Sequence, residues 1–382
     1  MARRNPNPGI THQSPSRRFP KGGWVVRYRD AENATLRRTF ETRQEALDFQ
    51  AAVRTDKNRG DFINPRRAAK PFRDVAEDWY ATAAPRLRPK TAAGYRSVLD
   101  THLLPALGPQ PIGRIRAAAI ERLIAGLNVS PGTQRNVLRV LSPIMRHAIK
   151  ADLIRVNPCS MVELPKVHRT EMLFLTAKQV AAVAEELTPV YRTLVLTAAC
   201  TGMRAGELSA LRVKRLDLMR GKIMVAESVA DVGGHLYYGP PKSGKARTIA
   251  LPPFLVQLLA VQTAGKGPED FVFTGPNGAP LRHGNYYARH FKPAVRRALP
   301  AHLHALRFHD LRHTCASLLI AQGVHPKAVA ERLGHGSVAI TMDRYGHLYD
   351  DHEEPIVAGL QETFQRAIAS GAKEATITPL AP

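Results

Sequence analysis

The spacing of apolar and polar residues predicts a small sheet-forming segment near the N-terminus. Side chains alternate over residues 24–29 and again over 35–40, as in two strands of a hairpin. Thr42 and Glu45 then stand at capping-box spacing, which predicts a helix over 42–58. We expect a sheet-plus-helix module of roughly 45 residues, close to the lower size limit for a fold that is stable by itself.

Helical periodicity takes over after a Pro- and Arg-rich linker at 64–71. Apolar residues recur at intervals of three and four, for example Leu138, Leu141 and Met145, which indicates one buried stripe. Prolines divide this region into short helices. The helices are predicted at 72–83, 88–99, 120–127 and 132–150.

The remaining chain mixes helices with a few strands and follows a second linker that starts at about residue 162. The pattern predicts helices over 177–187, 190–201, 253–263, 286–298 and about 354–369, and strands over 222–227, 235–238 and 246–251. A turn at 240–245 should join the last two strands. The expected fold class is mainly α with small β-sheets (α+β), in several domains.

Composition points to a globular protein with a polyanionic partner. Among 382 residues, 55 Lys and Arg oppose 32 Asp and Glu, a net charge of +23. Such an excess favours DNA, RNA or an acidic membrane surface. The lack of a basic amphipathic helix, of an apolar run long enough for a bilayer and of a secretory signal argues against the membrane. Residues 1–20 predict a flexible basic tail, and three cysteines without metal spacing fit buried thiols in a reducing cytoplasm.

The segment from Leu306 to Tyr349 concentrates cationic and hydrogen-bonding side chains. His309 and Arg312 are three residues apart and share a helix face, whereas His313 points elsewhere. Gly334 and Gly336 flank His335 and allow a sharp turn, and Ser337 can cap a short helix that ends at Tyr345. A face that collects these groups should bind an oxyanion, with phosphate as the leading candidate.

Five sequence pieces in order carry a specific resemblance. They are Thr201–Leu208 (TGMRAGEL), the Pro241-Lys242 hairpin, His309–Thr314 (HDLRHT), Leu333-Gly334-His335 and Tyr345. In order and spacing the set resembles the tyrosine recombinases, or phage-type integrases, over about 170–350. More loosely, 70–160 resembles the core-site-binding domain of that family, and 20–60 resembles its arm-site-binding module.

The resemblance implies a domain plan and partners. The expected domains are a basic tail and arm-type DNA-binding module (1–64), a helical core-site-binding domain (65–161), a catalytic domain (170–360) and a C-terminal tail (361–382). The expected partners are double-stranded DNA at core and arm sites, three further copies in a synaptic homotetramer, and a directionality or DNA-bending protein. No cofactor is expected, since the phosphotyrosyl ester conserves the bond energy. The expected location is the cytoplasm, on the nucleoid.

The resemblance also implies a nucleophile and its electrostatic partners. Tyr345 would attack phosphorus, leaving a 3′-phosphotyrosine and a free 5′-hydroxyl. Arg204 and Arg312 would bind the non-bridging phosphate oxygens bidentately, a geometry that lysine cannot reproduce. Glu207 would orient Arg204, although an i,i+3 pair on a helix is also an ordinary ion pair.

The remaining polar groups would transfer protons or contact the phosphate. His309 would donate a hydrogen bond and take or shuttle the phenolic proton, and His335 would hold another phosphate oxygen. Lys242 would protonate the leaving 5′ oxygen, with Lys245 as the second choice. Asp310 and His313 would support the site. The density of histidines also permits a zinc site, but no Cys, Asp or Glu completes a ligand set, so no metal is expected.

Arginines and lysines outside the site are candidates for DNA contact, with an ordinary solvated surface as the equal alternative. They are Arg27, Arg29, Arg37, Arg88, Lys90, Arg135 and Arg139. The expected function is site-specific recombination, either integration or excision of a mobile element or phage genome. Two alternatives stay open: a type IB topoisomerase, which relaxes supercoils with a similar residue cluster, and a DNA-binding regulator with a decayed site.

Overall fold

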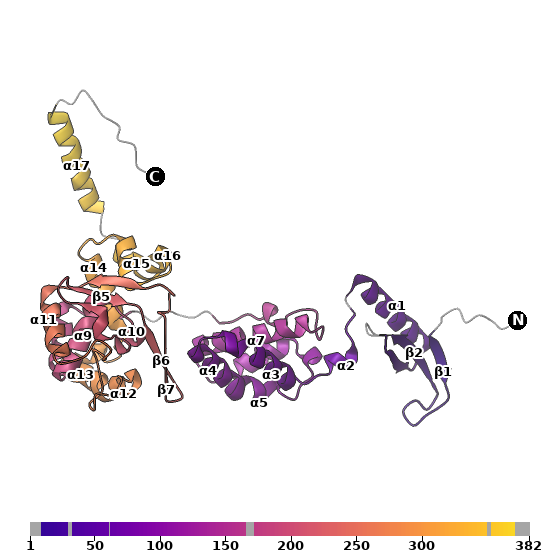
Figure 1. Ribbon diagram of the computed structural model, residues 1–382. Helices are drawn as coiled ribbons and strands as arrows, with labels where there is room; N and C mark the ends of the chain where they lie inside the picture. The colour runs from indigo at the N-terminus through magenta and orange to yellow at the C-terminus, as the bar shows by residue number, and fades with distance from the viewer. Residues whose placement is uncertain (1–8, 30–32, 61, 166–171, 350–352, 371–382) are drawn as a thin grey trace. The chain divides into compact units, whose positions relative to one another are not determined.

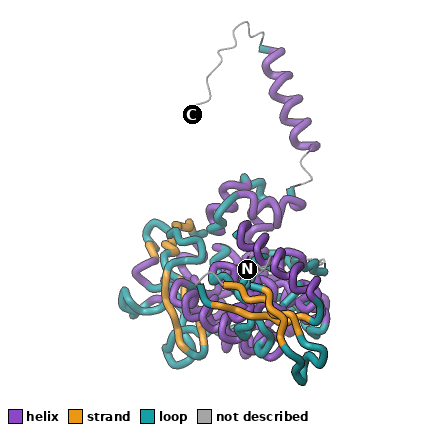
Figure 2. Tube along the Cα trace, turned by 90° about the vertical axis from the view of Figure 1, so that its right-hand side faces the viewer, coloured by secondary structure: helices purple, strands orange, loops and turns teal. Residues whose placement is uncertain are grey.

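The computed structural model, shown in Figure 1, describes residues 9–29, 33–60, 62–165, 172–349 and 353–370. Contacts divide the chain into two compact units, residues 1–169 and 170–382. Helix is the main element in both units, and the strands form three small sheets in the described residues (Figure 2). The expected fold class, mainly α with small β-sheets, is confirmed.

The N-terminal module is an antiparallel sheet with one helix packed on it. Its elements are β1 (Ile10–Gln13), β2 (Gly23–Arg29), β3 (Thr35–Phe40) and α1 (Arg43–Arg59). The sheet order is β1-β2-β3, with Trp24 paired to Phe40 across the predicted hairpin. Thr42 accepts the Glu45 backbone N–H at 3.2 Å, so the capping box starts α1 as predicted.

One prediction for this module was wrong. The segment 1–20 was expected to be a flexible tail, but residues 10–13 form β1 and pair with β2 from Ile10 opposite Val26 to Gln13 opposite Gly23. Only Ile10 of the four side chains is buried. The strand is held by backbone pairing at a sheet edge, which leaves almost no apolar periodicity to read in the sequence.

A helical bundle completes the first unit. Its helices are α2 (Pro65–Ala68), α3 (Phe72–Ala83), α4 (Pro89–Val98), α5 (Leu104–Leu107), α6 (Ala117–Ala125) and α7 (Pro131–Lys150). Leu141 and Met145 of α7 are fully buried, as the predicted stripe requires. The predicted linker at 64–71 contains α2, because Asn64 accepts the Arg66 backbone N–H at 2.9 Å and caps one helical turn.

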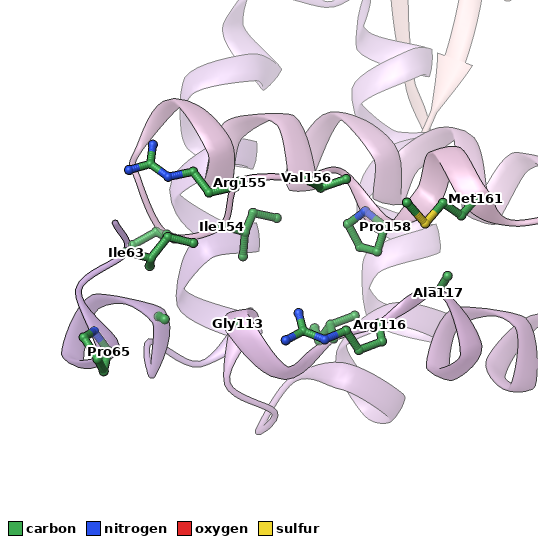
Figure 3. A pocket seen from close by; sticks show the side chains of 13 residues that line it. Ile63, Pro65, Gly113, Arg116, Ala117, Ile154, Arg155, Val156, Pro158 and Met161 are labelled. Carbon is green, nitrogen blue, oxygen red and sulfur yellow. The ribbon is translucent and has the colours of Figure 1, made fainter. Parts of the chain in front are cut away.

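An open, mostly apolar pocket of about 500 Å³ lies in this unit (Figure 3). Its walls come from the linker at Ile63 and Pro65, from Arg116, and from the segment after α7 with Ile154 and Pro158. None of the residues singled out as candidate catalytic groups lines it. The pocket therefore belongs to the architecture of the bundle and is separate from the cluster described below.

The second unit surrounds a buried helix. Its helices are α8 (Ala177–Glu185), α9 (Pro189–Thr201), α10 (Ala205–Ser209), α11 (Pro253–Thr263), α12 (His283–Tyr286), α13 (Lys292–Ala298), α14 (Asp310–Ile320), α15 (Pro326–Leu333), α16 (Val338–Tyr345) and α17 (Glu353–Ala369). α9 packs against α8, α11 and α14 and ends at Gly202, which adopts a left-handed conformation with φ of 64°. The apolar run of α9 is thus explained by burial on all sides.

Two small sheets flank this core and correct the strand prediction. β4 (Leu216–Asp217), β5 (Lys222–Val225) and β8 (Arg247–Ala250) form one sheet, whereas β6 (Ser228–Val232) and β7 (His235–Gly239) form a separate hairpin. The turn at 240–245 was expected to join two paired strands, but it connects strands of different sheets. β6 escaped prediction because most of its residues are half-buried, so no alternation marks it.

Candidate active site

Four segments of the second unit bring polar side chains together. They are the junction between α9 and α10, strand β8, the start of α14, and the corner between α15 and α16. α14 packs on α9 and on α15, α15 packs on α16 and β8, and α10 packs on β6, so these segments are neighbours in space (Figure 1). Residues far apart in the sequence, from Arg204 to Tyr345, therefore belong to one site.

Arg312 lies at the centre of this cluster and is only 3% exposed. Its Nη1 donates to the carbonyl oxygen of Gly202 at 2.7 Å, whereas its Nη2 is buried without a hydrogen-bond partner. Burial and the nearby charge of Arg204 lower the pKa of Arg312, yet a guanidinium stays protonated at neutral pH. A buried cation with an open donor is a strong binding point for an anion.

The carbonyl that holds Arg312 depends on a glycine. Gly202 has φ of 64°, and a Cβ at this position would stand 2.3 Å from Leu333 Cδ2 and 3.3 Å from Cys315 Sγ. Both the conformation and the space therefore require glycine here. The glycine that ends α9 therefore also fixes the partner of Arg312.

Arg204 is held by an acidic side chain and a second carbonyl. Its Nη1 donates to Glu207 Oε1 at 2.9 Å and its Nη2 to the carbonyl of Gly334 at 3.2 Å. The backbone N–H of Arg204 also donates to Glu207 Oε2 at 3.0 Å. With a side chain that is 24% exposed, Arg204 keeps part of its guanidinium open to solvent.

Arg247 on β8 was not anticipated, although it completes this network. Its Nη2 and Nη1 donate to the two oxygens of Glu207 at 2.7 and 3.2 Å, and its Nε donates to the Arg332 carbonyl at 3.0 Å. One sequence signal could have revealed it. Arg247 is two residues before buried Ile249 on a strand, so it lies on the inner face, where a charge needs a partner.

Glu207 is the one carboxylate among these arginines, and its side chain has no exposed surface. Burial by itself would raise the pKa of Glu207, but the hydrogen bonds and charges of Arg247 and Arg204 outweigh it and hold the pKa below its ordinary value. Three guanidiniums, those of Arg204, Arg247 and Arg312, face this single negative charge. The cluster therefore carries two uncompensated positive charges.

Tyr345 ends α16 and is fully buried. Its hydroxyl oxygen lies 2.7 Å from Nδ1 of His313. Burial raises the pKa of the Tyr345 phenol, while the charges of Arg312 and Arg344 act in the opposite direction. Ser337 occupies the cap position of α16 as predicted, but its side chain makes no capping hydrogen bond.

The two histidines assigned to phosphate contact have different surroundings. His335 Nδ1 is 2.8 Å from the hydroxyl of Thr341, a buried residue that the sequence reading missed, and this bond leaves Nε2 for another partner. Desolvation and the charges of Arg312 and Arg204 lower the pKa of His335 to about 3. The pKa of His309 is lowered too, first by desolvation, although the residue keeps an exposed edge. Both rings are therefore neutral at pH 7.

The lysines lie outside the hydrogen-bonded network. Lys242 and Lys245 are exposed in the turn between β7 and β8, and neither side chain has an ion-pair or hydrogen-bond partner among the described residues. Asp310 is buried and binds Arg307, with Oδ1 accepting from Nη2 at 2.8 Å. Asp310 thus anchors the start of α14, and the structure does not bring the lysines to the arginines.

The candidate DNA-contacting residues are exposed in the first unit. Arg27 and Arg37 are directly opposite in the β2–β3 pairing, and Arg29 lies on the same face as Arg27. The four candidates in the bundle are exposed too: Arg88, Lys90, Arg135 and Arg139. Arg135 and Arg139 are four residues apart on α7, so they share a face.

Neither a metal site nor a bilayer span is found in the part of the chain that the structure describes. No three His, Cys, Asp or Glu side chains there are placed to hold a metal ion. No helix of that part has both the length and the apolar character that crossing a bilayer requires.

Similar proteins share this architecture. A 28% identical relative, the prophage phiRv2 integrase of Mycobacterium tuberculosis, is covered over 94% of its length by 91% of this chain. The ICEBs1 integrase of Bacillus subtilis is 25% identical, with 87% of this chain and 93% of the relative covered. Among solved structures, the Tn1549 transposon integrase in complex with a circular intermediate DNA reaches a TM-score of 0.65 at 22% identity, covering 75% of this chain and 99% of that one.

A second solved structure matches a larger share of this chain. It is a lambda integrase dimer bound to a core site, with a TM-score of 0.57 at 18% identity over 92% of this chain and 97% of that one. The sequence profile of the phage integrase family matches residues 173–352, and the profile of the phage integrase central domain matches residues 72–163. The chain therefore belongs to the phage integrase, or tyrosine recombinase, family.

Proposed function

We propose that the chain is a site-specific DNA recombinase that cuts and rejoins strands through a covalent link between Tyr345 and a 3′-phosphate. The observation that carries this assignment is the buried Arg312, whose Nη2 is without a partner, in the same cluster as the buried phenol of Tyr345. The integrase relatives support the same reaction. The products would be integrated or excised DNA of a mobile element or phage.

The charges of the site fit the reaction. A phosphodiester carries one negative charge, and a second develops on its non-bridging oxygens as a fifth ligand bonds to phosphorus. The cluster has two uncompensated positive charges from Arg204, Arg312 and Arg247 against Glu207. Fixed cations of this kind stabilise the transition state more than the ground state, because they match the charge that appears only there.

Each remaining polar group has a proposed role. Neutral His335, with Nδ1 bonded to Thr341, would donate from Nε2 to a phosphate oxygen, and His309 would donate at the exposed edge. Lys242 would reach the 5′ leaving oxygen once DNA orders its turn, with Lys245 as the alternative. Glu207, Asp310 and His313 would position these groups.

The DNA partner is proposed from the relatives and from the charge of +23. Solved homologues are described as a dimer on a core site and as a tetramer on a Holliday junction. We propose the same partners here: duplex DNA and a homotetramer in synapsis, with a bending or directionality protein as an accessory. A protein that works on the chromosome would act in the cytoplasm, on the nucleoid.

The proposed domain boundaries rest on the contacts within the chain and on the family matches. Boundaries at 1–64, 65–161, 170–360 and 361–382 are supported by the division of contacts after residue 169 and by the two family profiles. The first domain would bind arm sites and the second, together with the catalytic domain, core sites. Removing residues 1–64 should abolish arm-site binding and leave cleavage at a core site.

A plasmid assay separates recombination from the relaxation that a topoisomerase would perform. Covalent trapping on genomic DNA of the source organism first identifies the cleaved sequence. Two copies of it are then placed on one supercoiled plasmid and incubated with the chain, with Tyr345→Phe as the inactive control. Deletion or inversion between the copies supports a recombinase, whereas relaxed circles without exchange would show a topoisomerase. If neither product appears while the DNA is bound, the chain is a regulator.

A further inference from the structure

The partner of the Tyr345 hydroxyl is His313, the residue that follows Arg312 on α14. His313 Nδ1 lies 2.7 Å from the phenol oxygen, and their rings meet edge-on at 5.7 Å between centroids. Both residues are buried, His313 at 4% exposure and Tyr345 at 0%. The contact joins α14 to α16, so the sequence neighbour of Arg312 faces the phenol of Tyr345.

The surroundings of His313 favour the neutral form of its imidazole. Groups on or just before its own helix are Asp310, Arg307, Arg312 and His309, and groups from other elements are Arg344, Tyr345 and His335. Burial lowers the pKa of His313, and three of these arginines lower it further, against the opposing charge of Asp310. The imidazole is therefore neutral at pH 7, so its Nδ1 can accept the hydrogen bond that the phenol donates.

We propose that His313 orients Tyr345 and accepts its proton as the phenol oxygen attacks phosphorus. This inference rests on the proposed role of Tyr345 as nucleophile. In the step, the O–H bond breaks and the proton moves to Nδ1 of His313. The bond from the phenol oxygen to phosphorus forms, and the bond from phosphorus to the 5′ oxygen breaks. The leaving oxygen receives a proton from a separate donor, for which Lys242 is the candidate. Rejoining reverses each transfer.

The geometry favours His313 over His309 as the acceptor. His309 lies beside His313, with ring centroids 5.2 Å apart, but among the described residues no hydrogen bond joins it to Tyr345. His309 keeps an exposed edge, which suits a contact with incoming DNA. A general base must lie within hydrogen-bond reach of the proton that it removes, and His313 meets this condition.

Proton transfer from Tyr345 to His313 also avoids the cost of ionising a buried phenol into solvent. The pKa of the Tyr345 phenol is raised, so ionisation into solvent would be costly at neutral pH. A neutral acceptor at 2.7 Å takes the proton without exposing a bare phenolate, and the resulting imidazolium is a counter-ion beside the new bond. Arg312 and Arg344, whose charges act on both the phenol and the imidazole, repel that imidazolium and favour return of the proton during rejoining.

Single-turnover cleavage tests the proposal. The full chain is incubated with a nicked suicide duplex of the trapped cleavage sequence, and the rate of adduct formation is measured from pH 5 to 9. His313→Asn places an amide oxygen near the Nδ1 position, which can accept a hydrogen bond but is not basic enough to take the phenolic proton. His313→Gln is the second variant should the first fold poorly. His302→Asn, an exposed histidine in the same unit, is the matched control. Thermal melting and gel shifts verify folding and DNA binding.

The expected loss in His313→Asn at pH 7 is roughly 100-fold or more, the usual contribution of a general base. The deficit should shrink as the pH rises, because the phenol then ionises without help. A duplex with sulfur as the bridging 5′ leaving atom should not restore the rate, since the defect concerns the nucleophile.

Three results would overturn the inference: a rate within about threefold of wild type, rescue by the sulfur substrate, or a deficit that is the same at every pH. If the wild-type chain forms no adduct, the proposed function fails as well. If wild type forms the adduct and Tyr345→Phe does not, a full rate in His313→Asn removes only the role given to His313.

Discussion

Replacing Arg247 by alanine should destabilise the second unit and slow cleavage, although Arg247 itself is not expected to touch DNA. The substitution removes both contacts to Glu207 and the contact to the Arg332 carbonyl. Removing one partner of a buried ion pair costs about 3–5 kcal/mol, because the other charge is left buried. Arg204 still pairs with Glu207 at 2.9 Å, so we expect a loss near the lower end, about 3 kcal/mol.

A loss of that size lowers the melting temperature by roughly 6–12 °C in a domain of this size. The assay is thermal unfolding followed by circular dichroism. Arg220→Ala is the matched control, because Arg220 has a side chain that is 79% exposed and pairs with Asp217 at 3.6 Å on the surface. The control should change the melting temperature by less than about 4 °C, since exposed pairs contribute at most about 1 kcal/mol.

The rate of DNA cleavage is the second measurement for Arg247→Ala. Without the Arg247 side chain, Glu207 can shift and displace Arg204. A displacement of about 1 Å in a catalytic group costs on the order of 100-fold in rate. Arg247→Lys should be intermediate, because one ammonium cannot reproduce the fork on Glu207 together with the carbonyl contact. Equal melting temperatures for Arg247→Ala and Arg220→Ala would refute the reasoning, as would an unchanged cleavage rate.

Three further outcomes follow from the site. Arg312→Lys should fold and bind DNA but lose about 10²–10³-fold in single-turnover cleavage, because an ammonium cannot reproduce the planar, forked donor geometry of the guanidinium; a loss below tenfold would contradict this. Gly202→Ala should lower the melting temperature by several degrees, since a Cβ there meets Leu333 at 2.3 Å, and an unchanged value would count against it. The pKa of Glu207 is lower in the folded protein than in the unfolded chain, so its ionised carboxylate stabilises the fold above the ordinary carboxyl pKa. This stabilisation is lost as the pH falls through the lowered pKa. Wild type should therefore lose more stability than Glu207→Gln below about pH 4.

Most of the fold could be predicted from the sequence, because the patterns that specify its helices and strands are local. Thr42 with Glu45, the alternation of β2 and β3, and the stripe on α7 each act within a few residues of the chain. β1 and β6 escaped, because a strand with side chains that are neither buried nor alternating is fixed by pairing with a distant segment. Such pairing leaves no mark in the strand's own sequence.

The candidate site was likewise predictable only where a local motif marks its residues. The residue types and order that mark Arg204, Arg312, His335 and Tyr345 are read directly from the chain, and the structure brings these four into one cluster. Arg247 depends on a long-range contact with Glu207 that no local motif announces. The contact of His313 with Tyr345 likewise appears only when α14 meets α16.

The most direct test of the account is to identify the residue that becomes attached to DNA. A suicide duplex is incubated with the chain, the adduct is digested with trypsin and nuclease, and the modified peptide is sequenced by mass spectrometry. The account predicts a phosphodiester on the phenol of Tyr345, joined to a 3′ end, with a free 5′-hydroxyl on the other product. Attachment to Tyr349 or to any other side chain, or to a 5′ end, would contradict it.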